Sequence, residues 1–305
     1  MHSPFFSIIV PTYNRAHLIG GTIESVIAQS FENWELLVID DGSTDHTIET
    51  VEKFSDLRIK YLWKENEERS VARNKGIELS QGKFVCFLDS DDIWRTNHLQ
   101  LLFEKIKSND NKKALYFTGM AWNFTDRKQD VIFETPEGKN RIEYIITNQI
   151  APSTVCIPTA ILQKEKFNTS LRINEDVELF ARIATKLELI QLREVTVDFI
   201  IHNENTKANT KNYITPQIQV MEMIFSNPEL KNKISSSFKK QCLRNLHHQL
   251  INHYLNTGEF SKMNTEILYF LFLYPFDFQN KSKIVLLLYH LPGGTVLRKI
   301  ISRLK

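Results

Sequence analysis

Short apolar runs alternate with helical patterns through the first third of the chain. The apolar runs have the length and the β-branched and aromatic content of buried strands, and they lie at residues 6–10, 34–40, 58–64 and 83–88. Between the first two runs, apolar residues recur at helical spacing, namely Ile19, Ile23, Val26 and Ile27. Strands that alternate with helices of this length predict an α/β domain with a mostly parallel sheet and helices on both faces.

The later part of the chain carries weaker patterns. In chain order they predict a helix at 99–107, a strand at 112–124, a polar irregular stretch at 126–150, a helix within 171–186 and a closing β-segment at 187–202. Beyond about residue 205 the pattern is helical, and no glycine-rich linker marks the change. We therefore predict an α/β domain at 1–205 and a mainly helical extension at 206–305.

Composition and charge narrow the classes of function. The 305 residues are 42% hydrophobic and 11% aromatic, which is typical of a folded globular protein with a full core. Lysine and arginine number 38 against 36 acidic residues, so the overall charge does not favour nucleic-acid binding. From residue 205 onward there are 14 basic and 5 acidic residues, which leaves 24 and 31 before it. An acidic first part and a basic second part predict two parts with different roles.

Cysteine usage and hydropathy bear on the compartment. Cys86, Cys156 and Cys242 are too few and too scattered for a disulfide framework or a zinc site, which favours a reduced, cytoplasmic setting. The amino-terminal residues lack the basic region and the long apolar core of a signal peptide. The longest apolar stretches are shorter than the ~20 residues that a spanning helix needs. The sequence predicts a protein that is soluble or lies on a membrane surface.

Polar and acidic residues follow three of the four predicted strands. The first strand ends in "PTYNR", the second in Asp40 and Asp41, and the fourth in Asp89, Asp91 and Asp92. In open α/β sheets ligands bind beyond the carboxyl ends of the strands, so we expect these residues to meet at one crevice. Like charges this close raise one another's pKa, so the cluster needs either a bound cation or a solvated surface. A solvated turn in which Asp92 caps a helix near Trp94 is the alternative to a cation site.

Four segments together resemble the family 2 glycosyltransferases in their order and spacing. They are "SIIVPTYNR", "SVIAQSFENWELLVIDDGSTDHT", "ARNKGIELSQGKFVCFLDSDDIW" and "NEDVELFARIA". The likeness covers roughly residues 5–205 and implies the GT-A nucleotide-diphospho-sugar transferase fold, a Rossmann-like mixed sheet flanked by helices. It also implies an inverting transfer from a nucleoside-diphosphate sugar, with UDP as the expected nucleotide. The expected acceptor is a hydroxyl of a glycan or a lipid-linked glycan in bacterial surface-polysaccharide synthesis.

The resemblance assigns a divalent cation to the end of the fourth strand. The triplet Asp89-Ser90-Asp91 matches the DxD-type motif of the family, with Asp91 as the direct ligand and Asp89 as a ribose or metal contact. His202 lies where some relatives place a residue near the diphosphate or the metal, although a lone histidine can also be structural. Carboxylate oxygens suit a hard ion such as Mn²⁺ or Mg²⁺.

The resemblance also implies the nucleotide contacts. Asp41 is expected to accept a hydrogen bond from the imide N–H of uracil or thymine, with Asp40 in support. An Asx-turn with Ser43 or Thr44 as a helix cap is a second interpretation, and both can hold. The other expected donor contacts are Pro11, Thr12, Tyr13, Arg15, Arg73 and Ser90. For Tyr13 the alternative is core packing, and for Arg73 it is an ion pair with the acidic cluster.

Two further expectations concern the donor loop and the acceptor side. Many relatives carry glycines where this chain has Glu67 and Glu68, which puts the geometry of the donor loop in question. By resemblance, Asp176 is the base that takes the proton from the attacking hydroxyl. Without the resemblance, acids at 175–176 would indicate a helix start that favours negative charge. The remaining acceptor-side residues expected are Glu175, Asp92 and Trp94.

The last residues, 281–305, combine an apolar segment, a Pro-Gly-Gly break and a basic amphipathic piece. In that piece Leu297, Ile300, Ile301 and Leu304 share one helical face, opposite Arg298, Lys299, Arg303 and Lys305. Such a helix can lie on anionic lipid, at the inner face of the plasma membrane. Packing against the catalytic domain or a homodimer partner is the alternative.

Two rival functions remain open at this point. A nucleotidyltransferase also gathers carboxylates at strand ends, but it usually has a glycine-rich, basic phosphate loop, which "PTYNRAHLIGG" is not. A non-catalytic sugar-nucleotide-binding module would tolerate the loss of Asp91 or Asp176, and both are present. An NAD-type fold is disfavoured because no G-x-G-x-x-G follows a strand.

Overall fold

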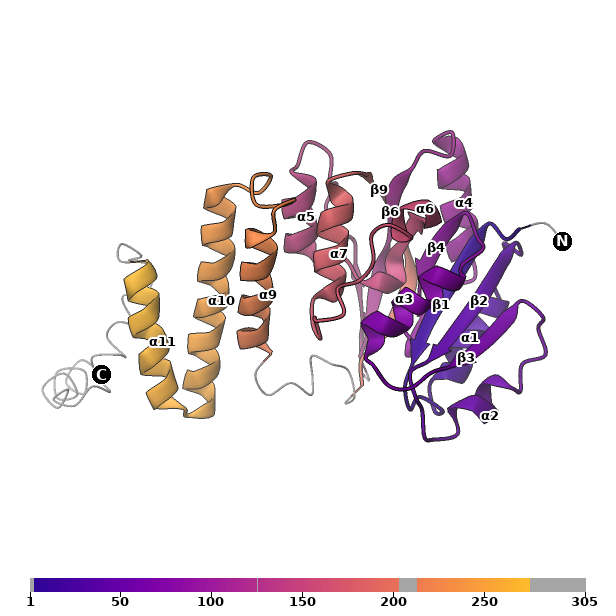
Figure 1. Ribbon diagram of the computed structural model, residues 1–305, viewed down its shortest axis with the longest axis horizontal. Helices are drawn as coiled ribbons and strands as arrows, with labels where there is room; N and C mark the ends of the chain where they lie inside the picture. Colours follow the sequence, from indigo (N-terminus) through magenta and orange to yellow (C-terminus); the bar gives the residue numbers. More distant parts are fainter. Residues whose placement is uncertain (1–2, 125, 203–212, 275–305) are drawn as a thin grey trace, which may run out of the picture. The chain divides into compact units, whose positions relative to one another are not determined.

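A computed structural model describes residues 3–124, 126–202 and 213–274 (Figure 1). The chain divides into two compact units. The first comprises Met1–Lys211 and Asn227–Ile234, and the second comprises Asn212–Ser226 and Ser235–Lys305. The sheet belongs to the first unit, and the described part of the second unit is helical. The return of residues 227–234 to the first unit is a feature that the sequence pattern does not indicate.

The described residues form one nine-stranded sheet in the order β3-β2-β1-β4-β8-β6-β9-β5, with β7 paired to β6. The strands are β1 (Phe6–Thr12), β2 (Trp34–Asp40), β3 (Ile59–Trp63), β4 (Phe84–Phe87), β5 (Asp92–Trp94), β6 (Ala114–Asn123), β7 (Lys128–Val131), β8 (Val155–Pro158) and β9 (Glu188–Ile200). The four strands predicted in the first third of the chain are confirmed.

Strand direction divides the sheet into two halves. Strands β3, β2, β1 and β4 are mutually parallel, as their alternation with helices predicts. Beyond β4 the pairing becomes mixed, because β8 runs antiparallel to both β4 and β6, and β5 runs antiparallel to β9. The expectation of a mostly parallel sheet is therefore wrong for the second half, and the mixed sheet of the GT-A fold is confirmed.

Helices flank the sheet in the first unit. They are α1 (Ile19–Ile27), α2 (Thr47–Val51), α3 (Arg69–Leu79), α4 (His98–Ser108), α5 (Arg141–Asn148), α6 (Thr159–Leu162) and α7 (Glu175–Ala184), with a 3₁₀ turn η1 (Pro152–Thr154). The prediction that 126–150 is irregular is wrong, because this stretch holds β7 and α5. The Asn140 side chain accepts hydrogen bonds from the backbone N–H groups of Ile142 and Glu143, which starts a helix too short for a clear periodic pattern.

Helix α3 packs closely on strands β1 and β2 (Figure 1). Its Gly76 faces Ile9 of β1, and a Cβ atom at Gly76 would lie 2.4 Å from Ile9 Cγ2. Only glycine allows this approach without movement of the helix or the strand. The close contact matters for function because α3 carries arginines that reach the carboxyl ends of the strands.

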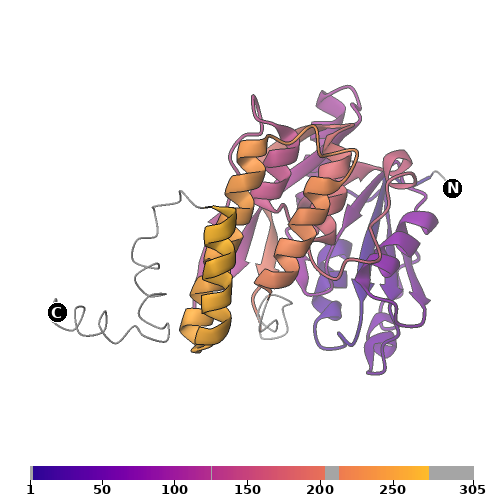
Figure 2. The same ribbon diagram turned by 60° about the vertical axis from the view of Figure 1, so that its left-hand side comes forward.

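The second unit contains α9 (Ile214–Ser226), α10 (Ser236–Thr257) and α11 (Phe260–Leu273), and α10 contacts both of the others (Figure 2). Ser235 Oγ accepts a hydrogen bond from Phe238 N at the start of α10, and Gly258 ends it at a φ of +74°. His247 Nδ1 lies 2.5 Å from Glu266 Oε1 and ties α10 to α11.

Within the described ranges, no helix combines the length and apolar character needed to cross a bilayer. The basic amphipathic piece expected in 281–305 lies outside the residues that the structure describes.

Candidate active site

The carboxyl ends of β2, β1 and β4 lie side by side, as predicted. Thr12 is paired with Asp40 in the β1–β2 register, and Asp41 N donates to Thr12 O at 2.8 Å just beyond it. On the other side of β1, Leu88 N donates to Ile9 O at 3.0 Å. Parallel pairing in this register brings the residues after each strand to one edge of the sheet.

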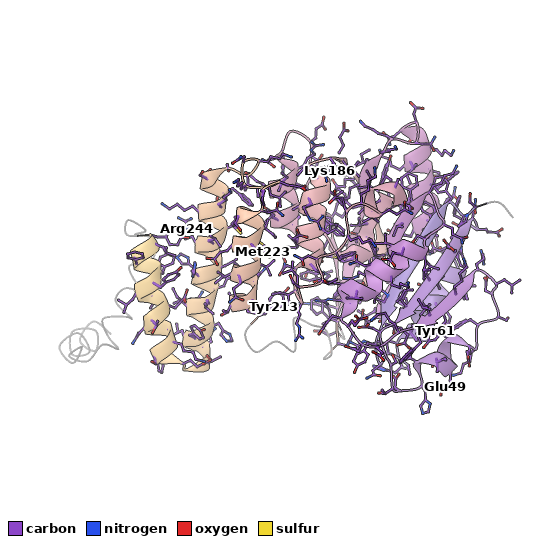
Figure 3. The ribbon with its side chains drawn as sticks, viewed as in Figure 1. Glu49, Tyr61, Lys186, Tyr213, Met223 and Arg244 are labelled. Atoms are coloured by element: carbon purple, nitrogen blue, oxygen red, sulfur yellow. The ribbon has the colours of Figure 1, made fainter. Side chains whose placement is uncertain are left out.

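Asp40 organises the turn after β2. Its carboxylate is fully buried, with Oδ1 accepting from Ser43 N at 2.7 Å and Oδ2 accepting from Tyr61 Oη at 2.6 Å. The Tyr61 side chain is labelled in Figure 3. Burial and the Asp40 charge raise the pKa of Tyr61, which therefore stays a hydrogen-bond donor. Both oxygens of Asp40 are engaged by the protein, so this residue shapes the turn that presents Asp41.

Asp41 lies under the segment that follows β3. Its Oδ1 accepts from Lys64 Nζ at 2.5 Å and from Glu67 N at 3.1 Å, and the side chain is buried. Gly42 has a φ of +89°, and a Cβ atom there would lie 2.8 Å from Asn66 N, so glycine lets the segment lie over the turn. Sequence reasoning missed Lys64, although its place directly after the third strand is a signal that the strand-end rule could have used.

The loops after β1 and β2 interlock through side chains. Asn14, at a φ of +51°, donates from its backbone N to Ser43 Oγ and accepts from Thr44 N, both at 2.8 Å. The prediction that Ser43 or Thr44 caps the next helix is wrong, because α2 begins at Thr47. Instead Asp45 Oδ1 accepts from Thr47 N at 3.1 Å. Ser43 and Thr44 bind the neighbouring loop instead.

The predicted nucleotide contacts of the first strand differ in exposure. Pro11 and Thr12 are buried at the end of β1. Tyr13 is 47% exposed, so the alternative that it packs in the core is wrong. Arg15 is partly buried, and its charge favours the ionised form of Asp91. Tyr13 and Arg15 are therefore accessible from solvent at this edge of the sheet.

Arg73 joins two acidic segments that are far apart in the sequence. Its guanidinium is 2% exposed and donates from Nη2 to Asp89 Oδ1 at 2.6 Å and from Nη1 to Glu175 Oε1 at 2.8 Å. The ring of Phe167 lies 5.3 Å from its Cζ. Of the two predicted roles for Arg73, the structure shows the ion pair with the acidic cluster. A buried charge held this way is costly to leave unpaired.

The acidic residues after β4 do not all lie in the same element of the fold. Asp92 is the first residue of β5 and pairs with Phe199 of β9, so the prediction that it caps a helix near Trp94 is wrong. Its Oδ2 accepts from Ser153 Oγ at 2.5 Å, and the same Ser153 Oγ accepts from Asp89 N at 3.1 Å. Sequence reasoning missed Ser153, because only the long-range packing of η1 against β4 brings it there.

Three predicted contacts, Trp94, Asp92 and Ser90, are buried side chains. Trp94 is buried, donates from Nε1 to Ser153 O at 2.8 Å and stacks on His98. Asp92 and Ser90 are also buried. An acceptor cannot reach the Trp94 ring or the Asp92 carboxylate in this conformation.

Asp91 and His202 meet at the ends of β4 and β9. His202 Nε2 lies 3.0 Å from Asp91 Oδ2. Burial, and then the charge of Asp89, raise the pKa of Asp91, while His202 acts in the opposite direction. Among the described residues, no group of three or more His, Cys, Asp or Glu side chains could hold a metal ion by itself. A hard divalent ion usually takes one or two protein carboxylates and fills its shell with phosphate and water, so this donor set fits partial ligation.

The acidic pair predicted on the acceptor side starts helix α7. Glu175 is buried, and its Oε1 receives Arg73 Nη1 and also Arg69 Nε, the latter at 2.7 Å. Asp176 is partly exposed and its Oδ1 accepts from Val177 N at 2.8 Å. Burial, together with the charge of Glu175, raises the pKa of Asp176 to about 6. The helix-start interpretation is confirmed, and it leaves a carboxylate of near-neutral pKa at the site.

The donor loop replaces the expected glycines with strained backbone. Glu68 precedes α3 with a φ of +80° and a ψ of 155°, a conformation that is essentially restricted to glycine. A glutamate therefore holds a conformation that favours glycine at the start of α3.

The mixed sheet, the acids at the carboxyl ends of its parallel strands and the acidic pair at a helix start together define a GT-A-type nucleotide-diphospho-sugar transferase fold. Residues 7–167 match the family model of "Glycosyl transferase family 2", and the chain belongs to this family.

Individual relatives agree with this membership. The chain is 33% identical over 73% of its length to an uncharacterized glycosyltransferase of Rickettsia bellii, and the match covers 33% of that protein. It is 46% identical over 34% of its length to the Escherichia coli UDP-Glc:alpha-D-GlcNAc-diphosphoundecaprenol beta-1,3-glucosyltransferase WfgD, covering 42% of that protein. Both matches therefore span less than half of the relative.

A solved structure supports the fold. The Staphylococcus aureus TarS 1-349 structure in complex with UDP-GlcNAc has a TM-score of 0.62 and 20% identity to the chain, covering 93% of this chain and 79% of that one.

Proposed function

We propose that the protein is an inverting glycosyltransferase that moves a sugar from a nucleoside-diphosphate donor, a UDP-sugar, to a hydroxyl of a glycan or lipid-linked acceptor in surface-polysaccharide synthesis. The observation that carries the proposal is the bridge of Arg73 between Asp89, at a parallel strand end, and Glu175, beside Asp176. The proposal assigns Asp89 to the donor side and Glu175 to the base side, and the Arg73 ion pairs join the two acids.

Asp176 is the base of the proposed reaction. The acceptor oxygen attacks the anomeric carbon while the bond from that carbon to the diphosphate oxygen breaks, and the hydroxyl proton passes to Asp176. A pKa of about 6 leaves the carboxylate ionised at neutral pH and still basic enough to accept a proton. Attack opposite the leaving group inverts the configuration of the sugar.

Asp41 and Tyr13 are the proposed contacts of the base of the nucleotide. Asp41 accepts from the imide N–H of uracil, and the exposed ring of Tyr13 stacks on the base. Asp40 supports this contact because its hydrogen bonds from Ser43 and Tyr61 hold the turn in place. The resemblance to TarS, whose structure was solved with UDP-GlcNAc, agrees with a uridine nucleotide.

Asp91 and His202, with Asp89 beside them, would hold a Mn²⁺ or Mg²⁺ ion, which when bound supplies positive charge for the departing diphosphate. Arg73 pairs with Asp89 and with Glu175, and Arg69 adds a second positive charge at Glu175. The carboxylates of Asp91 and Asp176 lie outside these ion pairs, and the proposal assigns them to the donor side and the acceptor side.

The acceptor side rests on a relative and on the chain's own carboxyl-terminal sequence. WfgD, by its name, acts on a diphosphoundecaprenol-linked sugar. We place this protein in the cytoplasm, at the inner face of the plasma membrane, where the basic piece at 297–305 meets anionic lipid. Flotation of the full chain with phosphatidylglycerol vesicles should be lost when Arg298, Lys299, Arg303 and Lys305 are all changed to Gln. Unchanged flotation of the variant would contradict membrane contact through this segment. So would a wild-type homodimer that dissociates in the variant, because the segment would then be a dimer contact.

Nucleotide release tests the reaction itself. Wild-type protein is assayed with UDP-, dTDP- and GDP-sugars in the presence of Mn²⁺ and an undecaprenyl-type diphosphosugar acceptor, beside Asp176→Asn, Asp91→Asn and the control Asp56→Asn. Asp56 forms an ion pair with Arg58 before β3, away from the strand ends. We expect release from a UDP-sugar with wild type and the control, and loss in both site variants. Equal turnover in all four proteins would contradict the mechanism. Donor binding without release would favour the non-catalytic module.

A further inference from the structure

Residues 64–69 connect the donor side of the site to the base side. We propose that Arg69 is a positioning residue, which holds Glu175 and through it sets the orientation and charge of the base Asp176. The inference rests on the proposed function, because it assigns Asp176 the role of base. Arg69 is not among the residues that the sequence motifs indicated.

The contacts of Arg69 join two helix starts. Arg69 is the first residue of α3 and Glu175 is the first residue of α7. Arg69 Nε lies 2.7 Å from Glu175 Oε1, and its Nη2 donates to the backbone carbonyl of Arg172 at 2.6 Å. The Glu175 carboxylate is buried, so a second arginine on the same oxygen fixes its direction firmly.

The other end of the segment is tied to the nucleotide side. Lys64 Nζ and Glu67 N both donate to Asp41 Oδ1. Between these ties and Arg69 lies Glu68, held at a φ of +80°. On the base side, Asn174 has a φ of +52° directly before Glu175. Strained residues persist where the surrounding contacts hold them, and here the contacts on both sides belong to the site.

Charge explains why the position of Arg69 matters for proton transfer. The charged groups that act on Asp176 are Glu175 on its own helix and Arg73 and Arg69 on α3, and Arg73 is itself paired with Asp89. Glu175 raises the pKa of Asp176, whereas Arg69 and Arg73 lower it. Removal of the Arg69 charge leaves Glu175 less compensated, so Asp176 should ionise at a higher pH.

The test compares Arg69→Gln, Arg69→Lys and a matched control, Arg58→Gln. Arg58 has the same 34% side-chain exposure, pairs with the Asp56 carboxylate and donates to the Glu32 carbonyl, but lies before β3. The pH profile of kcat/KM is measured for each folded variant. We expect the acid limb of Arg69→Gln to move up by about 0.5 pH unit and kcat to fall about tenfold, with the KM for the donor within about twofold. Arg69→Lys, which keeps the charge, should retain the wild-type acid limb.

A second measurement does not depend on turnover. The Asp176 carboxyl carbon, assigned with Asp176→Asn, is titrated by NMR in wild type and in Arg69→Gln, where its midpoint should rise by the same amount. An unmoved midpoint, or an equal shift in Arg58→Gln, would overturn the inference while the proposed function stands. If wild type transfers no sugar from any donor but the Asp176 midpoint still shifts in Arg69→Gln, the proposed function is rejected. Arg69 would then still act on Asp176, but it would have no role in catalysis. If Arg69→Gln does not fold, Arg69→Lys decides the test. An acid limb that moves in Arg69→Lys, which keeps the positive charge, would show that the charge at residue 69 does not set the pKa of Asp176.

Discussion

Two acidic pairs lie at the site, and their carboxylates have different surroundings. Asp40 and Asp41 follow a buried strand, and their oxygens accept hydrogen bonds from a backbone N–H, a tyrosine hydroxyl and a lysine. Glu175 and Asp176 start a helix, and there two arginines converge on Glu175, while burial and that neighbouring charge raise the pKa of Asp176.

This difference distinguishes a carboxylate that stabilises the fold from a carboxylate that can take part in the reaction. A carboxylate whose oxygens are satisfied by protein donors holds a loop in place, and its removal should lower stability. A carboxylate crowded by another acid in a low-dielectric position binds a proton more readily, which is what a general base needs. Asp40 and Asp176 should therefore respond differently to substitution, Asp40 in stability and Asp176 in activity.

The largest effect is expected at Asp176. Asp176→Asn keeps an oxygen that can accept from Val177 N but removes the base, so turnover should fall about 10³-fold while the melting temperature changes little. Nucleotide release and thermal unfolding by circular dichroism measure the two quantities. A fall of less than about tenfold would mean that another group accepts the proton.

A smaller effect, of a different kind, is expected at Asp40. Asp40→Ala leaves Ser43 N and Tyr61 Oη without their acceptor in the interior, so the free energy of unfolding should drop by about 3 kcal/mol. Urea denaturation measures it, with Tyr61→Phe as a milder companion that should cost about 1 kcal/mol. Stability equal to wild type in Asp40→Ala would break the contrast between the pairs.

The pH dependence of transfer should show the raised pKa of Asp176 directly. The base must be ionised to accept a proton, so the rate should rise with pH, with a midpoint near 6, and decline about tenfold per unit below it. The residual activity of Asp176→Asn should lack this limb. If the acid limb persists in Asp176→Asn, a group other than Asp176 causes it.

The smallest effect is expected in the donor loop. Glu68→Gly relieves a backbone conformation that disfavours any side chain, by roughly 1–3 kcal/mol, against about 1 kcal/mol of added flexibility in the unfolded chain. The net expectation is a gain of about 1 kcal/mol by urea denaturation. The neighbouring Glu67→Gly, which loses its ion pair with Lys64 and relieves no positive φ, should be neutral or destabilising. A loss in Glu68→Gly as large as in Glu67→Gly would show that residue 68 is not strained.

Much of the first half of the fold could be predicted from the sequence. Local alternation of apolar runs and helical patterns predicted strands at 6–10, 34–40, 58–64 and 83–88, which are β1, β2, β3 and β4, and predicted that their ends lie along one edge. The short β7 and α5 could not be found this way, because a few apolar residues such as Ile142 and Ile145 are buried by neighbours distant in sequence. Likewise, strand β5 is stabilised by pairing with β9, so the residues around Asp92 looked locally like a helix cap.

The sequence by itself determined that acids and a tyrosine would lie at the ends of parallel strands, because strands that alternate with helices run parallel and end at one edge of the sheet. It also indicated the family through motifs in order. Only the tertiary structure decided how those charges are shared. Arg73 lies between Asp89 and Glu175, Ser153 between Asp89 and Asp92, and Arg69 on Glu175. Ion pairs and hydrogen bonds act over a few ångströms in space, whereas their members are separated along the chain, so their partners and pKa shifts are properties of the folded chain.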